Sequence, residues 1–258
     1  MTDKRDQLYL NTEESENDST NQRFKFDERV VEVFNDMISR SVPGYQQILK
    51  MLPSLVKQLS DHQGNACHYY DLGCSLGAGM VSLAKGLAEE NTLNQHKLIG
   101  VDNSSAMLKQ AEAVLTEINS SLTNFGYELI EQDIQNIAIT QARIVLMNFT
   151  LQFIPLAERD SLINKIFNGL LPGGALVLSE KIKFDHGPTQ ESLTNIHHQF
   201  KADQGYSQLE IAKKRDAIEN VLIPETLETH MLRLTRAGFS VVTPWIQNLQ
   251  FVSILAIK

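Results

Sequence analysis

Acidic, amide and glycine residues recur along this chain at places where an apolar stretch ends. In YYDLGCSLGAG (residues 69–79), Asp71 is followed by Gly73, Gly77 and Gly79. A glycine-rich turn that follows a strand often cradles a nucleotide. The spacing D-x-G-x-x-x-G-x-G differs from the G-x-G-x-x-G of dinucleotide-binding turns, so the turn indicates a nucleotide-like ligand of another kind.

Side chains of the same kind end three further apolar stretches: Asp102 and Asn103 after KLIGV, Asp133 and Ile134 after YELIEQ, and Asn148 after ARIVLM. A carboxylate can accept both hydroxyl groups of a ribose, and a carboxylate beside an apolar side chain suits the amine and the ring of adenine. Several carboxylates would repel the phosphates of a dinucleotide. The lining therefore fits a ligand with adenine, ribose and a cationic centre, and S-adenosylmethionine is such a ligand.

These residues need strands that end at one edge of a sheet. From about residue 65 the chain alternates apolar stretches of strand length with helical patterns, which predicts a parallel sheet covered by helices on both faces. Ligands of such sheets bind beyond the carboxyl ends of the strands. The expected strands are a stretch ending at Asp71 and residues 97–102, 127–133, 142–153, 175–181, 239–247 and 251–258.

Apolar residues at helical spacing predict helices at residues 26–40, 45–59, 77–88, 156–170 and 224–237, and one capped by Ser104 or Ser105. Residues 182–221 are polar and mostly helical in pattern, and we interpret them as an insert over the ligand edge of the sheet. The last two strands are joined too closely for a parallel crossover, so the last strand should run antiparallel to the others. The expected α/β fold is Rossmann-like, with a mostly parallel seven-stranded sheet and one domain at residues 24–258.

Composition limits the classes of partner. The chain of 258 residues has a formal net charge of −8 and no long basic run, which disfavours direct nucleic-acid binding. No stretch of 18 apolar residues occurs, so no membrane-spanning helix is expected. The only cysteines, Cys67 and Cys74, do not make a disulfide framework, and a reducing cytoplasm fits best. Residues 1–23 are polar and predict a flexible arm.

This pattern resembles the class I S-adenosylmethionine-dependent methyltransferases over about residues 65–258. The segment MNFTLQF lacks the N-P-P-Y or D-P-P-Y motif of enzymes that N-methylate nucleic acids. Longer stretches are similar to the family of carboxy-S-adenosyl-L-methionine synthases over about residues 24–258. These stretches are FDERVVEVFNDMISRSVPGY (26–45), YDLGCSLGA (70–78), NFTLQFI (148–154), LPGGALVLSEK (171–181) and GYSQLEIAKKRDAIENVL (205–222).

The resemblance implies a carboxyl transfer from prephenate to S-adenosylmethionine. The products would be phenylpyruvate and carboxy-S-adenosylmethionine, which serves to modify the wobble uridine of tRNA. The resemblance also implies a homodimer and no metal. Such chemistry needs a dry pocket, because water quenches a deprotonated methyl group. The cofactor contacts implied by the resemblance are Tyr45, Gly73, Cys74, Ser75, Asp102, Asn103, Asp133, Ile134, Asn148 and Arg215.

Three of these residues have more specific expected roles. Arg215 is the expected catalytic residue, because a guanidinium fork binds a transferred carboxylate bidentately. Tyr45 follows a Val-Pro-Gly turn and would cover the methionine end of the cofactor. Cys74 would be a small spacer that lends its backbone N–H. His197 and His198 are adjacent on a predicted helix and cannot face each other, so one should pack and the other meet solvent.

Two alternatives stay open. The chain could be an ordinary methyltransferase that acts on a small molecule or on tRNA, or a module that binds the cofactor without catalysis. Arg215 favours carboxyl transfer over methyl transfer, because a cation near the sulfonium is unfavourable until an anion joins it. The intact set of strand-end residues argues against a module without activity.

Overall fold

The computed structural model describes residues 6, 28–60, 66–89, 93–122, 125–219 and 221–258. For residues 28, 29, 94 and 214–219 it describes the backbone and not the side chains. None of the helices in these ranges is long and apolar enough to cross a membrane.

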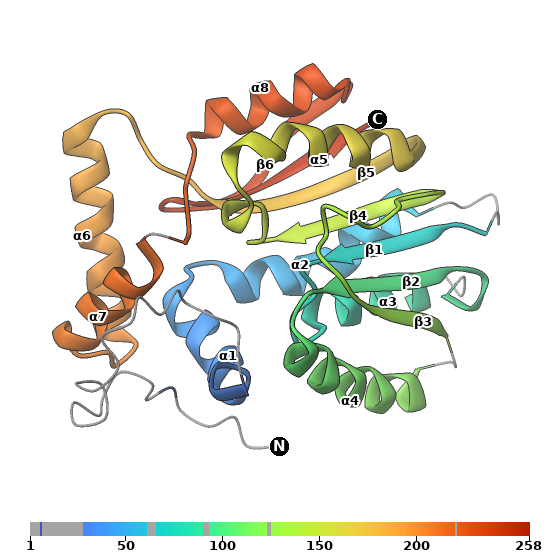
Figure 1. The fold of residues 1–258 in the computed structure, drawn as a ribbon, viewed down its shortest axis with the longest axis horizontal. Helices are drawn as coiled ribbons and strands as arrows, with labels where there is room; N and C mark the ends of the chain where they lie inside the picture. The colour runs from blue at the N-terminus through green and yellow to red at the C-terminus, as the bar shows by residue number, and fades with distance from the viewer. Residues whose placement is uncertain (1–5, 7–27, 61–65, 90–92, 123–124, 220) are drawn as a thin grey trace.

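One seven-stranded sheet forms the centre of the molecule, with the order β3-β2-β1-β4-β5-β7-β6 (Figure 1). Strands β1 to β5 pair in parallel, and β7 runs antiparallel to both β5 and β6. The expected Rossmann-like fold with an antiparallel last strand is confirmed. The strands are β1 (His68–Leu72), β2 (Lys97–Asp102), β3 (Gly126–Glu131), β4 (Ala142–Asn148), β5 (Leu170–Lys181), β6 (Val241–Asn248) and β7 (Phe251–Ile257).

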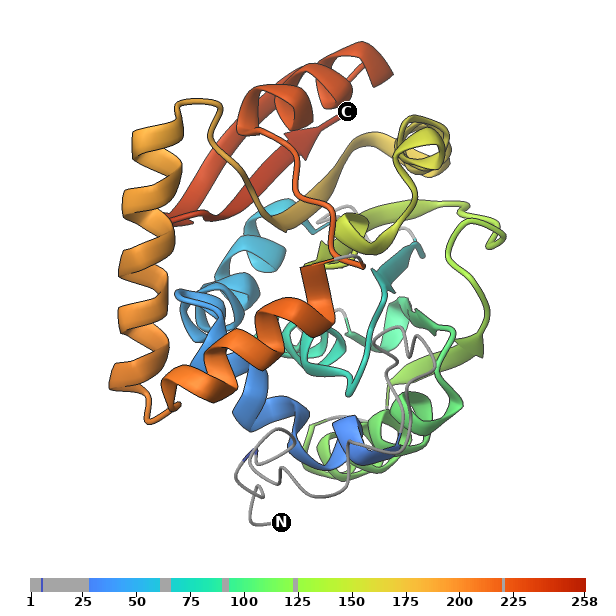
Figure 2. The same cartoon turned by 60° about the vertical axis from the view of Figure 1, so that its left-hand side comes forward.

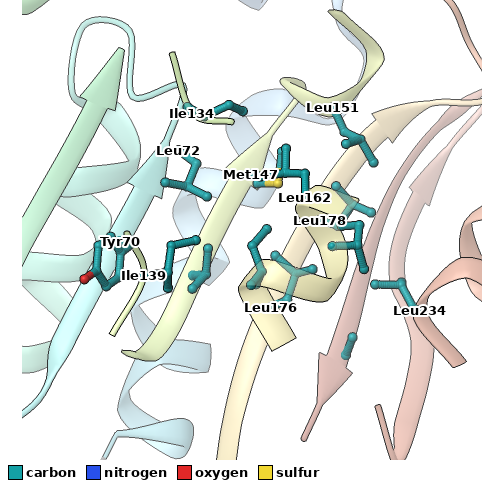
Figure 3. Packing of buried hydrophobic residues seen from close by; sticks show 14 of the residues in the cluster. Tyr70, Leu72, Ile134, Ile139, Met147, Leu151, Leu162, Leu176, Leu178 and Leu234 are labelled. Atoms are coloured by element: carbon teal, nitrogen blue, oxygen red, sulfur yellow. The ribbon is translucent and has the colours of Figure 1, made fainter. Parts of the chain in front are cut away.

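Helices cover both faces of the sheet, because strands buried on both sides need apolar partners on both. Helices α2, α3 and α4 supply apolar side chains to the core on one face, and α5 and α8 to the core on the other. Figure 3 shows the second core, where Leu162 and Leu234 lie near Leu176 and Leu178. The helices are α1 (Glu28–Ser41), α2 (Tyr45–Leu59), α3 (Ala78–Glu89), α4 (Ser105–Ser121), α5 (Leu156–Gly169), α6 (Gly187–Asp203), α7 (Gln208–Glu219) and α8 (Leu227–Ala237), with short 3₁₀ turns η1 (Leu93–Gln95) and η2 (Leu151–Phe153).

Three element boundaries differ from the sequence prediction by three residues or more. The strand predicted at 142–153 ends at Asn148, because Phe149 adopts a left-handed φ of 62° and η2 follows. Strand β5 begins at Leu170 and not at 175, since Leu170 already pairs with Ala142 of β4. The helix predicted from 224 begins at Leu227, after Thr226 accepts a hydrogen bond from the Thr229 N–H at 3.1 Å.

The insert at residues 182–221 is helical, as predicted, and carries α6 and α7. Figures 1 and 2 place these helices beyond the carboxyl ends of the central strands, on the side where α1 lies. His197 of α6 is buried and its Nε2 lies 2.7 Å from the Ser41 carbonyl oxygen of α1, whereas His198 is half-buried. The insert and α1 therefore form one layer over the ligand edge of the sheet.

Within the predicted flexible arm, residues 1–23, only Asp6 falls in the described ranges. Asp6 is buried, its N–H donates to the Asp36 carboxylate at 2.7 Å, and it accepts a hydrogen bond from the Tyr206 hydroxyl at 2.8 Å. This residue thus contacts both α1 and the segment that joins α6 to α7. The rest of the arm lies outside the described residues, so its flexibility stays a prediction.

Candidate functional site

The glycine turn after β1 is fastened to the neighbouring strand. The N–H groups of Gly73 and Cys74 both donate to the Val101 carbonyl, at 2.8 and 3.0 Å. A side chain at Gly73 would overlap Thr150, and its φ of 78° is also one that favours glycine. The Cys74 N–H thus serves β2 in this structure, and a contact of Cys74 with the ligand stays a prediction.

Asp102 stands at the carboxyl end of β2 with both oxygens oriented by the backbone. Its Oδ2 accepts the Ser75 N–H and its Oδ1 accepts the Ser104 N–H, each at 2.9 Å. Burial raises the pKa of this carboxyl group above its usual value, and the backbone donors act in the opposite direction. A carboxylate has about four lone-pair positions, so Asp102 can still accept hydrogen bonds from a ribose.

Asp71 lies behind the turn and was not among the predicted cofactor contacts. Its side chain is buried against Gly79, where any Cβ would overlap the carboxylate. Burial and the charge of Asp102 raise the pKa of Asp71 to about 7, while a hydrogen bond from the Met80 backbone lowers it. The third glycine of the motif thus makes room for a buried acid at the start of α3.

A cavity of about 820 Å³ opens beyond the carboxyl ends of the strands. At its acidic side, the Asn103 amide donates to the Asp133 carboxylate at 2.8 Å, which links the ends of β2 and β3. The structure brings seven of the ten predicted contact residues into the cavity lining, from the ends of four strands. They are Gly73, Ser75, Asp102, Asn103, Asp133, Ile134 and Asn148.

Donors and acceptors in this lining suit an adenosine-bearing ligand. The Oδ1 atom of Asn148 is buried and has no hydrogen-bond partner among the described residues. A buried acceptor without a partner costs about 1–3 kcal/mol, and a ligand donor would satisfy it. Ile134 is buried and offers an apolar surface beside Asp133. The residues present therefore fit S-adenosylmethionine.

The other three predicted contacts are not among the described lining residues of the cavity. Tyr45 is buried behind the cavity wall with its ring centroid 6.3 Å from that of Phe149, and burial followed by the Asp71 charge raises the pKa of its hydroxyl group. Cys74 is buried in the same apolar cluster. Arg215 belongs to α7, but its side chain lies outside the described part of the structure. The proposed roles of Tyr45, Cys74 and Arg215 stay predictions.

The rest of the lining comes from residues that the sequence did not single out. Helix α1 supplies an apolar wall with Phe34, Met37 and Ile38. The amphipathic pattern of α1 was visible in the sequence, but nothing indicated that its apolar side faces a ligand. Further lining residues are Phe149, Thr150, Gln152, Phe153, Lys201, Val221, Leu222 and Phe251.

The described residues form no evident set of metal ligands. No three side chains of the His, Cys, Asp and Glu types gather there in a way that could hold a metal ion. His197 contacts the Ser41 carbonyl oxygen and the ring of Phe251, whose centroid lies 5.0 Å from that of His197. The expectation of a reaction without metal stays a prediction.

Comparison with known proteins agrees with the geometry of the site, which fits S-adenosylmethionine. A methyltransferase domain family matches residues 70–174. A carboxy-S-adenosyl-L-methionine synthase from Hahella chejuensis is 47% identical over 259 residues, which span all of both chains. The enzyme of that name from Colwellia psychrerythraea is 46% identical and covers 91% of this chain and 92% of its own.

Solved structures with low sequence identity share the fold. Magnesium protoporphyrin IX methyltransferase from Synechocystis PCC 6803, with bound S-adenosylmethionine, superposes with a TM-score of 0.56 at 15% identity and covers 92% of this chain and 86% of its own. A putative S-adenosylmethionine-dependent methyltransferase from Methanococcus maripaludis gives a TM-score of 0.55 at 19% identity, covering 93% and 96%. The sheet described above is thus that of class I methyltransferases.

Proposed function

Because this chain belongs to the carboxy-S-adenosyl-L-methionine synthase family, we propose that it transfers a carboxyl group from prephenate to S-adenosylmethionine. Its product, carboxy-S-adenosylmethionine, would supply the modification of the tRNA wobble uridine. The observation that carries the proposal is 47% identity with a synthase of this name over the whole of both chains. The cavity supports it, because its acidic strand ends fit an adenosine and its volume of about 820 Å³ leaves room for a second small molecule.

The chain's own residues would bind and orient the cofactor. Asp102 would accept the ribose hydroxyl groups while the Ser75 and Ser104 amides hold its carboxylate in place. Asp133 and Ile134 would hold the adenine, and Asn148 would accept a donor from the remaining part of the ligand. The apolar residues of α1 would keep water from the reacting groups, which matters because water would reprotonate the methyl carbon.

The atoms balance in the proposed transfer. Prephenate loses its ring carboxyl group as carbon dioxide and its ring hydroxyl group as hydroxide, and becomes phenylpyruvate. The methyl group beside the sulfonium gives up one proton, which forms water with the hydroxide. The electron pair left on that carbon forms the new bond to carbon dioxide. This transfer needs no nucleophile from the protein. It requires only that the protein encloses the two ligands together.

Incubation with S-adenosylmethionine and prephenate tests the proposal directly. Mass analysis should show a cofactor heavier by one carboxyl group, together with equimolar phenylpyruvate. A control without prephenate should give neither product. Unchanged S-adenosylmethionine in the presence of prephenate would contradict the proposed donor. Loss of the methyl group to an added acceptor would instead favour an ordinary methyltransferase.

Arg215 is expected to bind the carboxylate that distinguishes carboxy-S-adenosylmethionine from S-adenosylmethionine. Arg215→Ala should reduce the preference for carboxy-S-adenosylmethionine over S-adenosylmethionine by roughly a hundredfold, because a bidentate charged pair is worth about 1.5–3 kcal/mol. Arg215→Lys should recover only part, since a point charge does not copy the fork. Competitive binding of the two ligands measures this, with exposed Lys109→Ala as control. Equal preference in all four proteins would place the carboxylate elsewhere.

A further inference from the structure

Opposite charges line opposite ends of the cavity. The acids Asp102 and Asp133 stand at the ends of β2 and β3. Lys201 also lines the cavity, and it lies on α6 one helical turn after His197, whose ring contacts Phe251 of β7. The lining residue Phe251 marks this basic end: it pairs in register with Lys181, the last residue of β5, and contacts His197. The cationic sulfonium ligand fits the acidic end, which leaves the basic end for something else.

Lys181 belongs to this basic end. Side chains alternate between the two faces of a strand, so Lys181 lies on the same face of β5 as Val177. Val177 packs in the core on the side of α2 and α3. Lys181 pairs in register with Phe251, whose ring contacts His197, and the charge of Lys181 contributes to lowering the pKa of His197. Among the described residues no carboxylate pairs with Lys181. A largely buried cation without a counter-ion is unfavourable, and burial accordingly lowers the pKa of its amine.

His197 cannot act as the counter-ion, nor does it add a charge. Its Nε2 lies 2.7 Å from the Ser41 carbonyl oxygen, so this nitrogen donates the hydrogen bond. Burial, and next the charge of Lys201, lowers the pKa of His197 to about 3, which keeps the ring neutral. His197 and Lys201 are four residues apart and share one face of α6. The basic end thus places two lysines beside a neutral ring whose N–H is already bonded to Ser41.

We propose that this basic end of the cavity is a carboxylate subsite, in which Lys201 and Lys181 bind the carboxylate that the donor keeps. The inference rests on the proposed function, since prephenate carries two carboxylates. One is transferred, and the other stays in the side chain of phenylpyruvate. An anion held at this end would compensate Lys181 and would orient the ring carboxyl group toward the cofactor at the acidic end. The two lysines therefore determine donor binding and not cofactor binding.

Binding of phenylpyruvate tests the subsite, because this co-product has only the retained carboxylate. Calorimetric titration into protein saturated with S-adenosylmethionine compares wild type with Lys201→Met and Lys181→Met. Each variant should bind phenylpyruvate about tenfold or more weakly, as expected for the loss of one charged hydrogen bond. The matched control is Lys183→Met, which removes an exposed lysine two residues along the chain from Lys181. It should change nothing.

A further variant and a comparison of outcomes distinguish an error in the subsite from an error in the proposed reaction. Lys201→Arg keeps the charge and should retain most of the affinity for phenylpyruvate. If Lys201 had only a structural role, that affinity would not depend on the charge at this position. The subsite is wrong if both Met variants bind phenylpyruvate like wild type, or if they lose S-adenosylmethionine affinity by the same factor. If wild type makes no carboxylated product from prephenate, yet the Met variants still lose phenylpyruvate affinity, the proposed reaction fails and the subsite stands.

Discussion

The carboxylate of Asp102 divides its acceptor positions between the protein and the expected ligand. Asp102→Ala removes the ribose contacts, and charged hydrogen bonds are worth about 1.5–3 kcal/mol each. We therefore expect S-adenosylmethionine affinity to fall at least tenfold while the fold survives. Isothermal calorimetry measures the affinity, and circular dichroism checks the fold. An unchanged affinity would mean that the ribose binds elsewhere.

Glu180 of β5 is fully buried, and neither carboxylate oxygen has a hydrogen-bond partner of good geometry among the described residues. Burial raises its pKa to about 8, although Arg159 and nearby backbone N–H groups act in the opposite direction. In the unfolded chain a glutamate ionises near pH 4.3. Between these values the folded protein holds a proton that the unfolded chain has lost, so this group's contribution to stability falls as pH rises.

Glu180→Gln keeps the shape and removes the titration. The free energy of unfolding of the variant, relative to wild type, should therefore increase between about pH 5 and about pH 8. Urea denaturation of both proteins at the two pH values measures it. Asp71 titrates in both proteins, so its effect cancels in the comparison. A difference that does not depend on pH would contradict the raised pKa of Glu180.

At the scale of elements, one buried arginine joins α5 to the segment between α7 and α8. The Arg159 guanidinium donates to the carbonyls of Gln152, Ile154 and Ile223 at 3.1, 2.9 and 2.9 Å. It also pairs with Glu225 at 2.6 Å, and Glu225 pairs with Arg233 of α8 at 2.7 Å. Because Gln152 and Ile154 line the cavity, this network positions part of the cavity wall.

Arg159→Met should destabilise the fold by about 3–5 kcal/mol, because it leaves Glu225 with one buried partner fewer. Urea denaturation measures the loss, and Glu225→Gln in the same background tests the coupling. The double variant should lose less than the sum of the two single variants. Additive losses would show that the pair contributes little beyond its separate contacts.

The sequence predicted elements best where local patterns decide them. Helix α2 was predicted at its observed bounds, Tyr45–Leu59, and strand β2 at Lys97–Asp102, since periodicity and flanking turns are local. The end of β4 was missed because Phe149 is an unexpected residue for a left-handed turn. Lys201 and the Arg159 network were missed because their roles depend on contacts between segments far apart in the chain. Strand ends predicted the acidic half of the site and not its basic half.

At the scale of the whole molecule, a net charge of −8 bears on nucleic-acid binding. Proteins that grip phosphate backbones release counter-ions, and their affinity depends strongly on salt. We expect no tight tRNA binding by this chain, even though its proposed product would serve tRNA modification. Filter binding over a range of salt concentrations measures it. Submicromolar affinity at physiological salt would contradict this and would favour a tRNA methyltransferase.

The separation of charge along the cavity also has a consequence for inhibitors. A compound that joins adenosine to a carboxylate through a spacer would occupy the acidic and basic ends at once. Once its nucleoside half is bound, its carboxylate is confined near the lysines at a high effective concentration. Such a bisubstrate compound should bind far more tightly than either half. Methyltransferases whose cavities lack the basic end would gain nothing from the carboxylate, so the same charge pattern would also provide selectivity.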